Sequence, residues 1–178
     1  QPWERIMTRA DSKINSMADL KGKRLAVAQR GTMADLELIA LKKTHGVGLQ
    51  DVELAIVPAP NQPLALDRGQ VDAIYALPPY DTVAEKRFGA RTVVNAADFV
   101  PYVGYGTLAL RTDFIEAYPD AAVKLIKTFI RLSRWINDND QKANQEVGRQ
   151  LGVDNDLWPF LRRPYFARNG LPVMPNVW

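Results

Sequence analysis

Apolar residues in the first hundred positions fall into short runs, which are separated by segments with apolar residues at helical spacing. Short apolar runs bounded by glycine, proline or polar residues are typical of buried strands. They predict strands at residues 24–29, 53–57, 71–76 and 92–94. The intervening segments predict helices at residues 32–45, 61–69 and 82–88. This alternation predicts a mainly parallel sheet with helices on both faces, an α/β fold.

The first of these helices carries signals at both of its ends. Thr32 resembles an N-cap residue and is followed three positions later by Asp35. His45 lies in the last predicted turn, and Gly46 supplies a stop signal directly after it. The pattern therefore predicts a strand that leads into a helix through the turn at Arg30 and Gly31.

After residue 100 the pattern changes. Residues 102–110 form a longer extended run, and Thr112 can cap a short helix. A longer helix with an apolar stripe is predicted at 119–137, followed by a polar helix at 141–150. The segment 154–178 is rich in proline and aromatic residues and needs a surface to cover.

Composition narrows the classes of protein that this chain can represent. Its 178 residues are 47% hydrophobic and 24% charged, which excludes a collagenous or disordered chain and is enough for one globular core or two small lobes. The net charge of +3 is scattered, so it indicates neither a nucleic-acid nor a membrane surface. The sequence has no cysteine and one histidine, which excludes disulfides, thiolate chemistry and a multi-histidine metal centre.

The sequence also lacks any apolar stretch of about 18 residues, so no membrane-spanning helix is predicted. It opens on Gln1 without a signal-peptide pattern, and we expect a trimmed or partial chain.

Three loops follow predicted strands at residues 29–33, 59–62 and 76–80. In an open parallel sheet the carboxyl ends of the strands share one edge, where ligands bind near helix N-termini. Backbone N–H groups at these helix ends favour an anion. Thr32 could donate its hydroxyl to a ligand, and Tyr75 or Tyr80 could form an aromatic wall. We expect the opposite edge of the sheet to bind nothing.

Each of these residues also has a purely structural interpretation. Thr32 can serve as a helix cap alone, and Gly31 as a turn glycine. His45 is explained by its place near a helix end. Asp72 and Asp81 do not indicate an acid/base pair, because the sequence suggests no nucleophile, histidine or metal partner for either.

The run SMADLKGKRLAVA at residues 16–28 resembles the segment that opens the second lobe of bacterial solute-binding proteins of ABC importers. The branch it resembles contains proteins for nitrate, sulfonate, taurine and thiamine-pyrimidine precursors. The run LALDRGQVDAI at residues 64–74, followed by a proline-bearing loop, is similar to a second segment of that branch. The helix beginning at Pro119 resembles a third.

This resemblance implies a periplasmic-binding-protein fold, in which two α/β lobes joined by two extended crossings trap a ligand between them. Residues 1–15 would form the first crossing, 16–100 the second lobe and 101–111 the return crossing. Residues 112–178 would form C-terminal helices and an aromatic tail that pack on the first lobe. The opening strands and helices of that first lobe are missing from this sequence.

The resemblance also implies function. The protein would be a non-catalytic solute-binding component of an ABC importer, located in the bacterial periplasm or on the cell exterior. Its partners would be a small anionic or polar solute and the importer permease, with no cofactor, metal or nucleic acid. The family's ligand-facing loops place the binding residues at Gly31, Thr32, Met33, Asn61, Leu77, Pro79 and Tyr80.

Two other functions stay open. An enzyme on the same scaffold, such as a desulfinase, decarboxylase or pyrimidine synthase, resembles this branch, and the missing lobe could hold its catalytic groups. A ligand-sensing domain of a transcriptional regulator has a similar fold, although the ADLKGK motif argues against it.

Overall fold

A five-stranded sheet forms the centre of the α/β lobe in the computed structural model, which describes residues 4–95 and 108–162. The strands are β1 (Arg5–Thr8), β2 (Arg24–Val27), β3 (Glu53–Ile56), β4 (Ala73–Ala76) and β5 (Arg91–Asn95). Their order across the sheet is β3-β2-β4-β1-β5. β2 pairs in parallel with both β3 and β4, which confirms the parallel core expected from the alternating pattern.

The strand β1 was not predicted as part of the sheet. It lies between β4 and β5 and is antiparallel to both, so β5 joins the other strands only through it. The predicted lobe at 16–100 therefore omits a central strand. Its four residues are all buried, and so short a segment between polar residues gives no alternating signal. The predicted role of residues 1–15 as a crossing between two lobes stays a prediction.

The helices of the lobe begin and end close to their predicted positions. They are α1 (Met33–His45), α2 (Gln62–Asp67) and α3 (Tyr80–Phe88), and two short 3-10 turns lie at η1 (Ala18–Leu20) and η2 (Ala59–Asn61). α1 ends at Gly46, which has a φ of 72°, in the left-handed region that glycine adopts without strain. The start of α3 lies at Tyr80 rather than at the predicted Thr82.

The alternation of side chains along the strands divides the core into two layers. On β4, Ala73 and Tyr75 face the layer that contains Leu38 of α1. Ile74 and Ala76 face the opposite layer, whose members include residues of α2 and α3, Leu66 among them. This confirms that helices cover both faces of the sheet, as the fold class requires.

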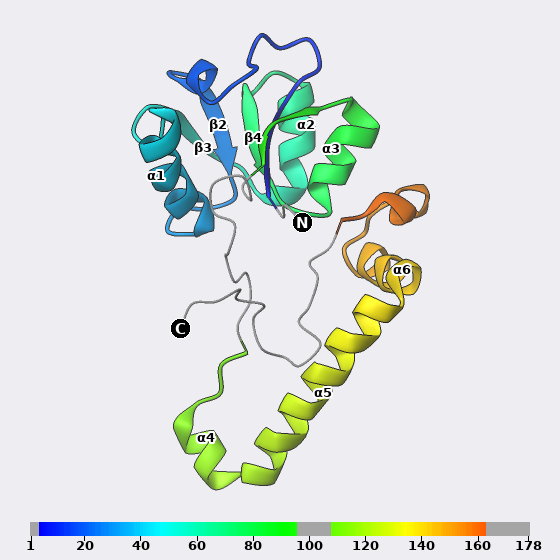
Figure 1. Cartoon of the computed structure of the whole chain (residues 1–178). Helices are drawn as coiled ribbons and strands as arrows, with labels where there is room; N and C mark the ends of the chain where they lie inside the picture. The colour runs from blue at the N-terminus through cyan, green and yellow to red at the C-terminus, as the bar shows by residue number, and fades with distance from the viewer. Residues whose placement is uncertain (1–3, 96–107, 163–178) are drawn as a thin grey trace.

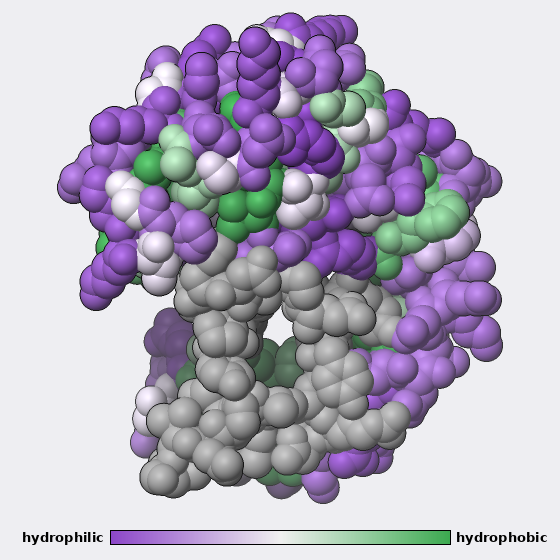
Figure 2. Space-filling view, turned by 45° about the horizontal axis from the view of Figure 1, so that its top comes forward, coloured by the Kyte–Doolittle hydropathy of each residue, from purple (hydrophilic) through white to green (hydrophobic). Residues whose placement is uncertain are grey.

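The C-terminal helices extend from the lobe as an arm. They are α4 (Thr112–Ala117), α5 (Pro119–Asp138) and α6 (Asp140–Gln150), followed by the 3-10 segment η4 (Asn155–Phe160). α4 lies farthest from the lobe, α5 leads back toward it, and η4 then lies against α3 (Figure 1). Most of the extended run predicted at 102–110 lies outside the described residues. Over the visible face of the lobe, hydrophilic side chains predominate (Figure 2).

We expected all of residues 112–178 to pack on the first lobe, but the end of the arm packs elsewhere. Val153, Leu157 and Leu161 form a small apolar cluster against Val83 of α3, so this stretch packs on the α/β lobe. By contrast, α5 leaves many large apolar side chains exposed along its length. Packing of α5 on a first lobe stays a prediction.

Candidate functional site

The three predicted loops lie at one edge of the sheet. They follow the carboxyl ends of β2, β3 and β4, and β2 is the neighbour of both other strands. This carboxyl edge lies on the side of the lobe that faces α4 and α5 (Figure 1). The topology therefore brings the loops together as expected, while contact with a solute stays a prediction.

In the first loop, Gly31 is exposed and has a φ of 74°, so the turn requires a residue that tolerates the left-handed region. Thr32 occupies the N-cap position of α1, but its side chain makes no cap hydrogen bond. Its hydroxyl donates instead to the carbonyl oxygen of Gln29 at 3.3 Å. The interpretation of Thr32 as a side-chain cap is therefore wrong, although its place at the helix start is confirmed. Met33 is half-buried and begins α1.

Asp35, in the first turn of α1, connects the helix to this loop. Its carboxylate accepts the backbone N–H of Gly31 at 2.9 Å and pairs with Arg30 at 3.1 Å from Nε. The Gly31 hydrogen bond is the main cause that holds the pKa of Asp35 below its usual value, and Arg30 adds to it. One N–H donor of the first loop is thus already bound to a carboxylate.

In the second loop, Asn61 is exposed and directly precedes α2. Its backbone N–H donates to Pro58 at 2.8 Å, which closes the η2 turn. The neighbouring Gln62 is buried and donates from Nε2 to the carbonyl of Val57 at 3.0 Å. Gln62 therefore ties this loop to the end of β3, a role that the sequence did not reveal because glutamine at a helix start is commonplace.

In the third loop, a cis peptide bond joins Pro78 to Pro79, and Tyr80 is the first residue of α3. Leu77 and Tyr80 are half-buried, whereas Pro79 is buried. The predicted turn at this position is confirmed. Contact of Tyr80 with a solute stays a prediction.

Tyr75 does not form the aromatic wall considered for it. Its side chain is 5% exposed and belongs to the core layer under α1. Its hydroxyl donates to Oε2 of the buried Glu37 at 2.5 Å, so the phenol satisfies an acid inside the lobe. Of the two tyrosines, Tyr80 alone remains a candidate for the edge.

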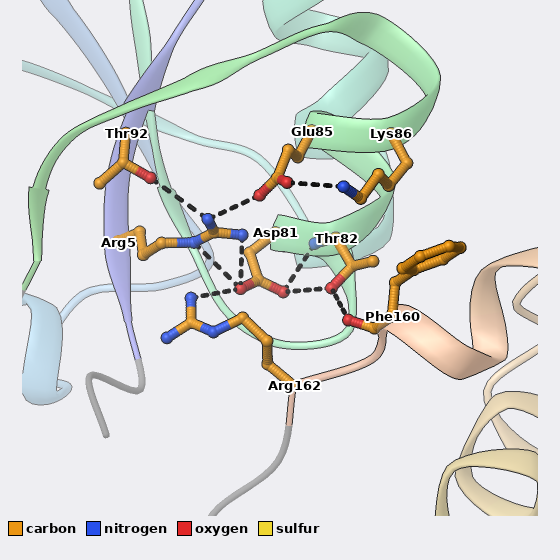
Figure 3. Close-up of polar contacts among 8 residues, drawn as sticks. All are labelled: Arg5, Asp81, Thr82, Glu85, Lys86, Thr92, Phe160 and Arg162. Carbon is orange, nitrogen blue, oxygen red and sulfur yellow. Dashed lines mark hydrogen bonds and ion pairs between the residues drawn. The ribbon is translucent and has the colours of Figure 1, made fainter. Parts of the chain in front are cut away.

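Beside the third loop lies a cluster of charged groups around Asp81, at the start of α3 (Figure 3). Asp81 is fully buried; its Oδ2 accepts a hydrogen bond from Arg5 Nε at 3.1 Å and forms an ion pair with Arg5 Nη2 at 2.9 Å. Arg162 contacts the same oxygen through Nη1 at 2.8 Å. The other carboxylate oxygen accepts the backbone N–H of Thr82 at 2.7 Å. A buried carboxylate is tolerated when it is paired and hydrogen-bonded in this way.

Arg5 also connects this cluster to the neighbouring elements. Its Nη1 donates to Glu85 Oε2 at 2.8 Å and to Thr92 Oγ1 at 3.2 Å, so one guanidinium joins β1, α3 and β5. The hydrogen bond from Arg5 is the main cause that lowers the pKa of Glu85. The sequence suggested no partner for Asp81. Arg5 and Arg162, which pair with it, lie 76 and 81 positions away along the chain.

No group of three or more histidine, aspartate or glutamate side chains within 4–95 and 108–162 is placed to hold a metal ion. In those same ranges, no helix is long and apolar enough to cross a membrane. The opposite edge of the sheet has a surface depression of about 250 Å³, whose lining residues are Ser12, Lys13, Ile14, Asp19, Lys23 and Asp72.

Solved structures of similar fold include binding proteins and an enzyme. The periplasmic aliphatic sulphonate binding protein SsuA from Escherichia coli superposes with a TM-score of 0.71 at 19% identity, covering 89% of this chain and 54% of that one. The desulfurization enzyme DSZB superposes with a TM-score of 0.59 at 21% identity, covering 99% of this chain and 64% of that one. At these identities the likeness establishes the fold, which is that of periplasmic solute-binding proteins.

Sequence comparison gives a more specific relationship. A Bacillus subtilis (strain 168) protein named "Putative aliphatic sulfonates-binding protein" is 30% identical over 138 residues, which are 78% of this chain and 41% of that protein. The chain thus spans less than half of this relative and about half of the Escherichia coli protein. Residues 3–152 match the NMT1-like family, and the chain therefore belongs to that family.

Proposed function

We propose that this protein is the solute-binding component of an ABC-type importer and that its solute is a small aliphatic sulfonate. The observation that carries the proposal is the 30% identity to a protein named for aliphatic sulfonates, within a shared family. The protein works in the periplasm or on the cell exterior and delivers the solute to an importer permease, without catalysis.

The geometry of the carboxyl edge supports an anionic solute. Three loops converge there, and arginines accompany two of them, Arg30 beside the first and Arg162 beside the third. A sulfonate is a tetrahedral oxyanion, which backbone N–H groups and guanidinium groups bind through charge-assisted hydrogen bonds. The proposed contacts are those implied by the family resemblance, namely Gly31, Thr32, Met33, Asn61, Leu77, Pro79 and Tyr80.

Calorimetric titration of the full-length protein tests the proposal with a matched pair of anions. Ethanesulfonate and propionate carry the same alkyl group but differ in the acid, so their comparison isolates recognition of the sulfonate. We expect ethanesulfonate to bind at least about tenfold more tightly, because contacts arranged for a tetrahedral anion leave one donor unused by a planar one. Equal or tighter binding of propionate, or no binding of either anion, would contradict the sulfonate assignment.

A second candidate is an enzyme on the same scaffold, favoured by the likeness to the desulfurization enzyme. The chain has no cysteine, and its histidine, His45, is exposed at the far end of α1 from the carboxyl edge. These observations favour binding over catalysis by this part of the protein. Release of sulfite from an alkanesulfinate by the full-length protein would support the enzyme instead.

A further inference from the structure

η4 runs alongside α3 and is joined to it at both ends. Near the C-terminal end of α3, Arg87 pairs with Asp154 at 2.9 Å and with Asp156 at 2.6 Å. Near its N-terminal end, the hydroxyl of Thr82 donates to the carbonyl of Phe160 at 3.4 Å. Residues 161 and 162, which directly follow η4, are thereby brought to the N-terminal end of α3, beside the third loop.

Arg162 occupies this position. Its guanidinium reaches Asp81 from the N-terminal end of α3, whereas Glu85 and Lys86 lie further along the helix (Figure 3). Asp81 directly follows Tyr80, so Arg162 lies against the loop that we propose contacts the solute. The side chain of Arg162 is 25% exposed, while that of Asp81 is fully buried.

Two arginines contact the buried carboxylate of Asp81. Arg5 alone contacts Asp81 through two nitrogen atoms, which already gives the buried carboxylate a counter-ion. Glu85 is paired with Arg5 at 2.8 Å and with Lys86 at 3.0 Å. Arg162 therefore brings a second guanidinium to a carboxylate that Arg5 already pairs. Arg162 approaches Asp81 from the side that lies away from Glu85 and Lys86 (Figure 3).

We infer that Arg162 binds the anionic group of the solute and that Asp81 is a positioning residue that orients its guanidinium. The inference rests on the proposed function and adds a residue that the family resemblance did not supply. Guanidinium presents parallel N–H donors that match an oxyanion, and a fixed guanidinium loses less side-chain entropy on binding. The ligand class is a sulfonate or another tetrahedral oxyanion.

The test compares two arginines of the same α3–η4 contact. Arg162→Gln removes the proposed anion contact, whereas Arg87→Gln weakens the same contact at its far end. In titrations of the full-length protein with ethanesulfonate, we expect Arg162→Gln to lower affinity about tenfold or more and Arg87→Gln to change it less than about twofold. Arg162→Lys should retain part of the affinity, because it keeps the charge but not the planar donors.

The outcomes separate this inference from the function on which it rests. If the parent binds ethanesulfonate and Arg162→Gln binds it equally well, the inference fails while the proposed function stands. Equal losses in Arg162→Gln and Arg87→Gln also overturn it, because they indicate that only the docking of η4 matters. If the parent binds no ethanesulfonate, the proposed function and this inference fall together.

A double-mutant cycle tests the role of Asp81 itself. If Asp81 acts through Arg162, Asp81→Asn weakens binding in the parent but has no further effect in Arg162→Gln. A full additional loss in the Arg162→Gln background overturns the positioning role. Thermal melts of each variant accompany the titrations, and the Arg162 and Arg87 comparison decides the anion contact even if Asp81→Asn does not fold.

Discussion

Asp35 and Asp81 lie in the first turns of α1 and α3, the two longer helices that begin at the carboxyl edge. Each accepts a backbone N–H, from Gly31 and Thr82 respectively, and each is paired with arginine. An acid in this position is favoured by the helix dipole. These carboxylates therefore already offset part of the positive charge at the two helix N-termini. We infer that attraction of an anionic solute depends more on arginine side chains than on the helix ends.

Substitution of Thr32 separates binding from stability at the first loop. Because its hydroxyl makes no cap bond, Thr32→Ala should change the free energy of unfolding by less than about 0.5 kcal/mol. If the hydroxyl contacts the solute, the same change weakens binding by about 1–2 kcal/mol. Calorimetric titration of the full-length protein, alongside thermal melts, measures both quantities.

Thr32→Ser keeps the hydroxyl and should bind nearly as the parent does. His45→Ala is a second control, because His45 is exposed at the opposite end of α1. If His45→Ala loses binding while Thr32→Ala binds as the parent does, the solute binds at the opposite edge of the sheet, and the predicted site is wrong.

At the scale of elements, the lobe is held by two core layers that depend on strict alternation along the strands. α1 packs on one face of the sheet with Leu38 and Leu41, and the other face is covered by α2 and α3. A helix in such a layer has one face in the core and one in water. The stability of the lobe therefore depends on which side of α1 a substitution touches.

Two leucines of α1 provide a matched test of this packing. Leu38 is 0% exposed and Leu36 is 61% exposed, although they are two residues apart on one helix. Leu38→Ala should lower the free energy of unfolding by about 2–5 kcal/mol, because it leaves a cavity in the core. Leu36→Ala should change it by less than about 0.5 kcal/mol. Denaturant unfolding measures both, and similar losses for the two variants would contradict the assigned face of α1.

At the scale of the whole molecule, the α/β lobe depends on segments from outside its central stretch of sequence. β1 comes from residues 5–8 and lies between β4 and β5, and η4 comes from residues 155–160 and packs near α3. Arg5 of β1 and Arg162, two residues after η4, both form ion pairs with the carboxylate of Asp81. The N-terminal strand and the end of the arm are thereby joined at the carboxyl edge.

Truncation tests this dependence. A fragment of residues 16–100 lacks β1, which leaves β4 and β5 without their shared neighbour and Asp81 without Arg5. We expect this fragment to show no cooperative thermal transition by circular dichroism, whereas residues 1–178 unfold cooperatively. A cooperative transition of the shorter fragment would indicate that β1 is dispensable for the sheet.

The pattern of apolar runs, glycines and prolines was sufficient to predict β2 to β5, α1 to α3 and the order of their alternation. Those features depend on local interactions, such as the left-handed stop at Gly46 and the turn before Tyr80, so nearby residues determine them. The parallel pairing of β2 with its neighbours and the shared edge of the loops follow from that alternation.

Tertiary structure alone decided the features that join distant parts of the chain. The placement of β1 in the sheet, the burial of Tyr75 against Glu37 and the convergence of Arg5 and Arg162 on Asp81 have no local signature. Each depends on contacts between residues far apart in sequence, and the cost of burying a charge is met only once those partners meet in space. The sequence therefore determined the elements and the edge where they open, and the folded chain determined which charges meet there.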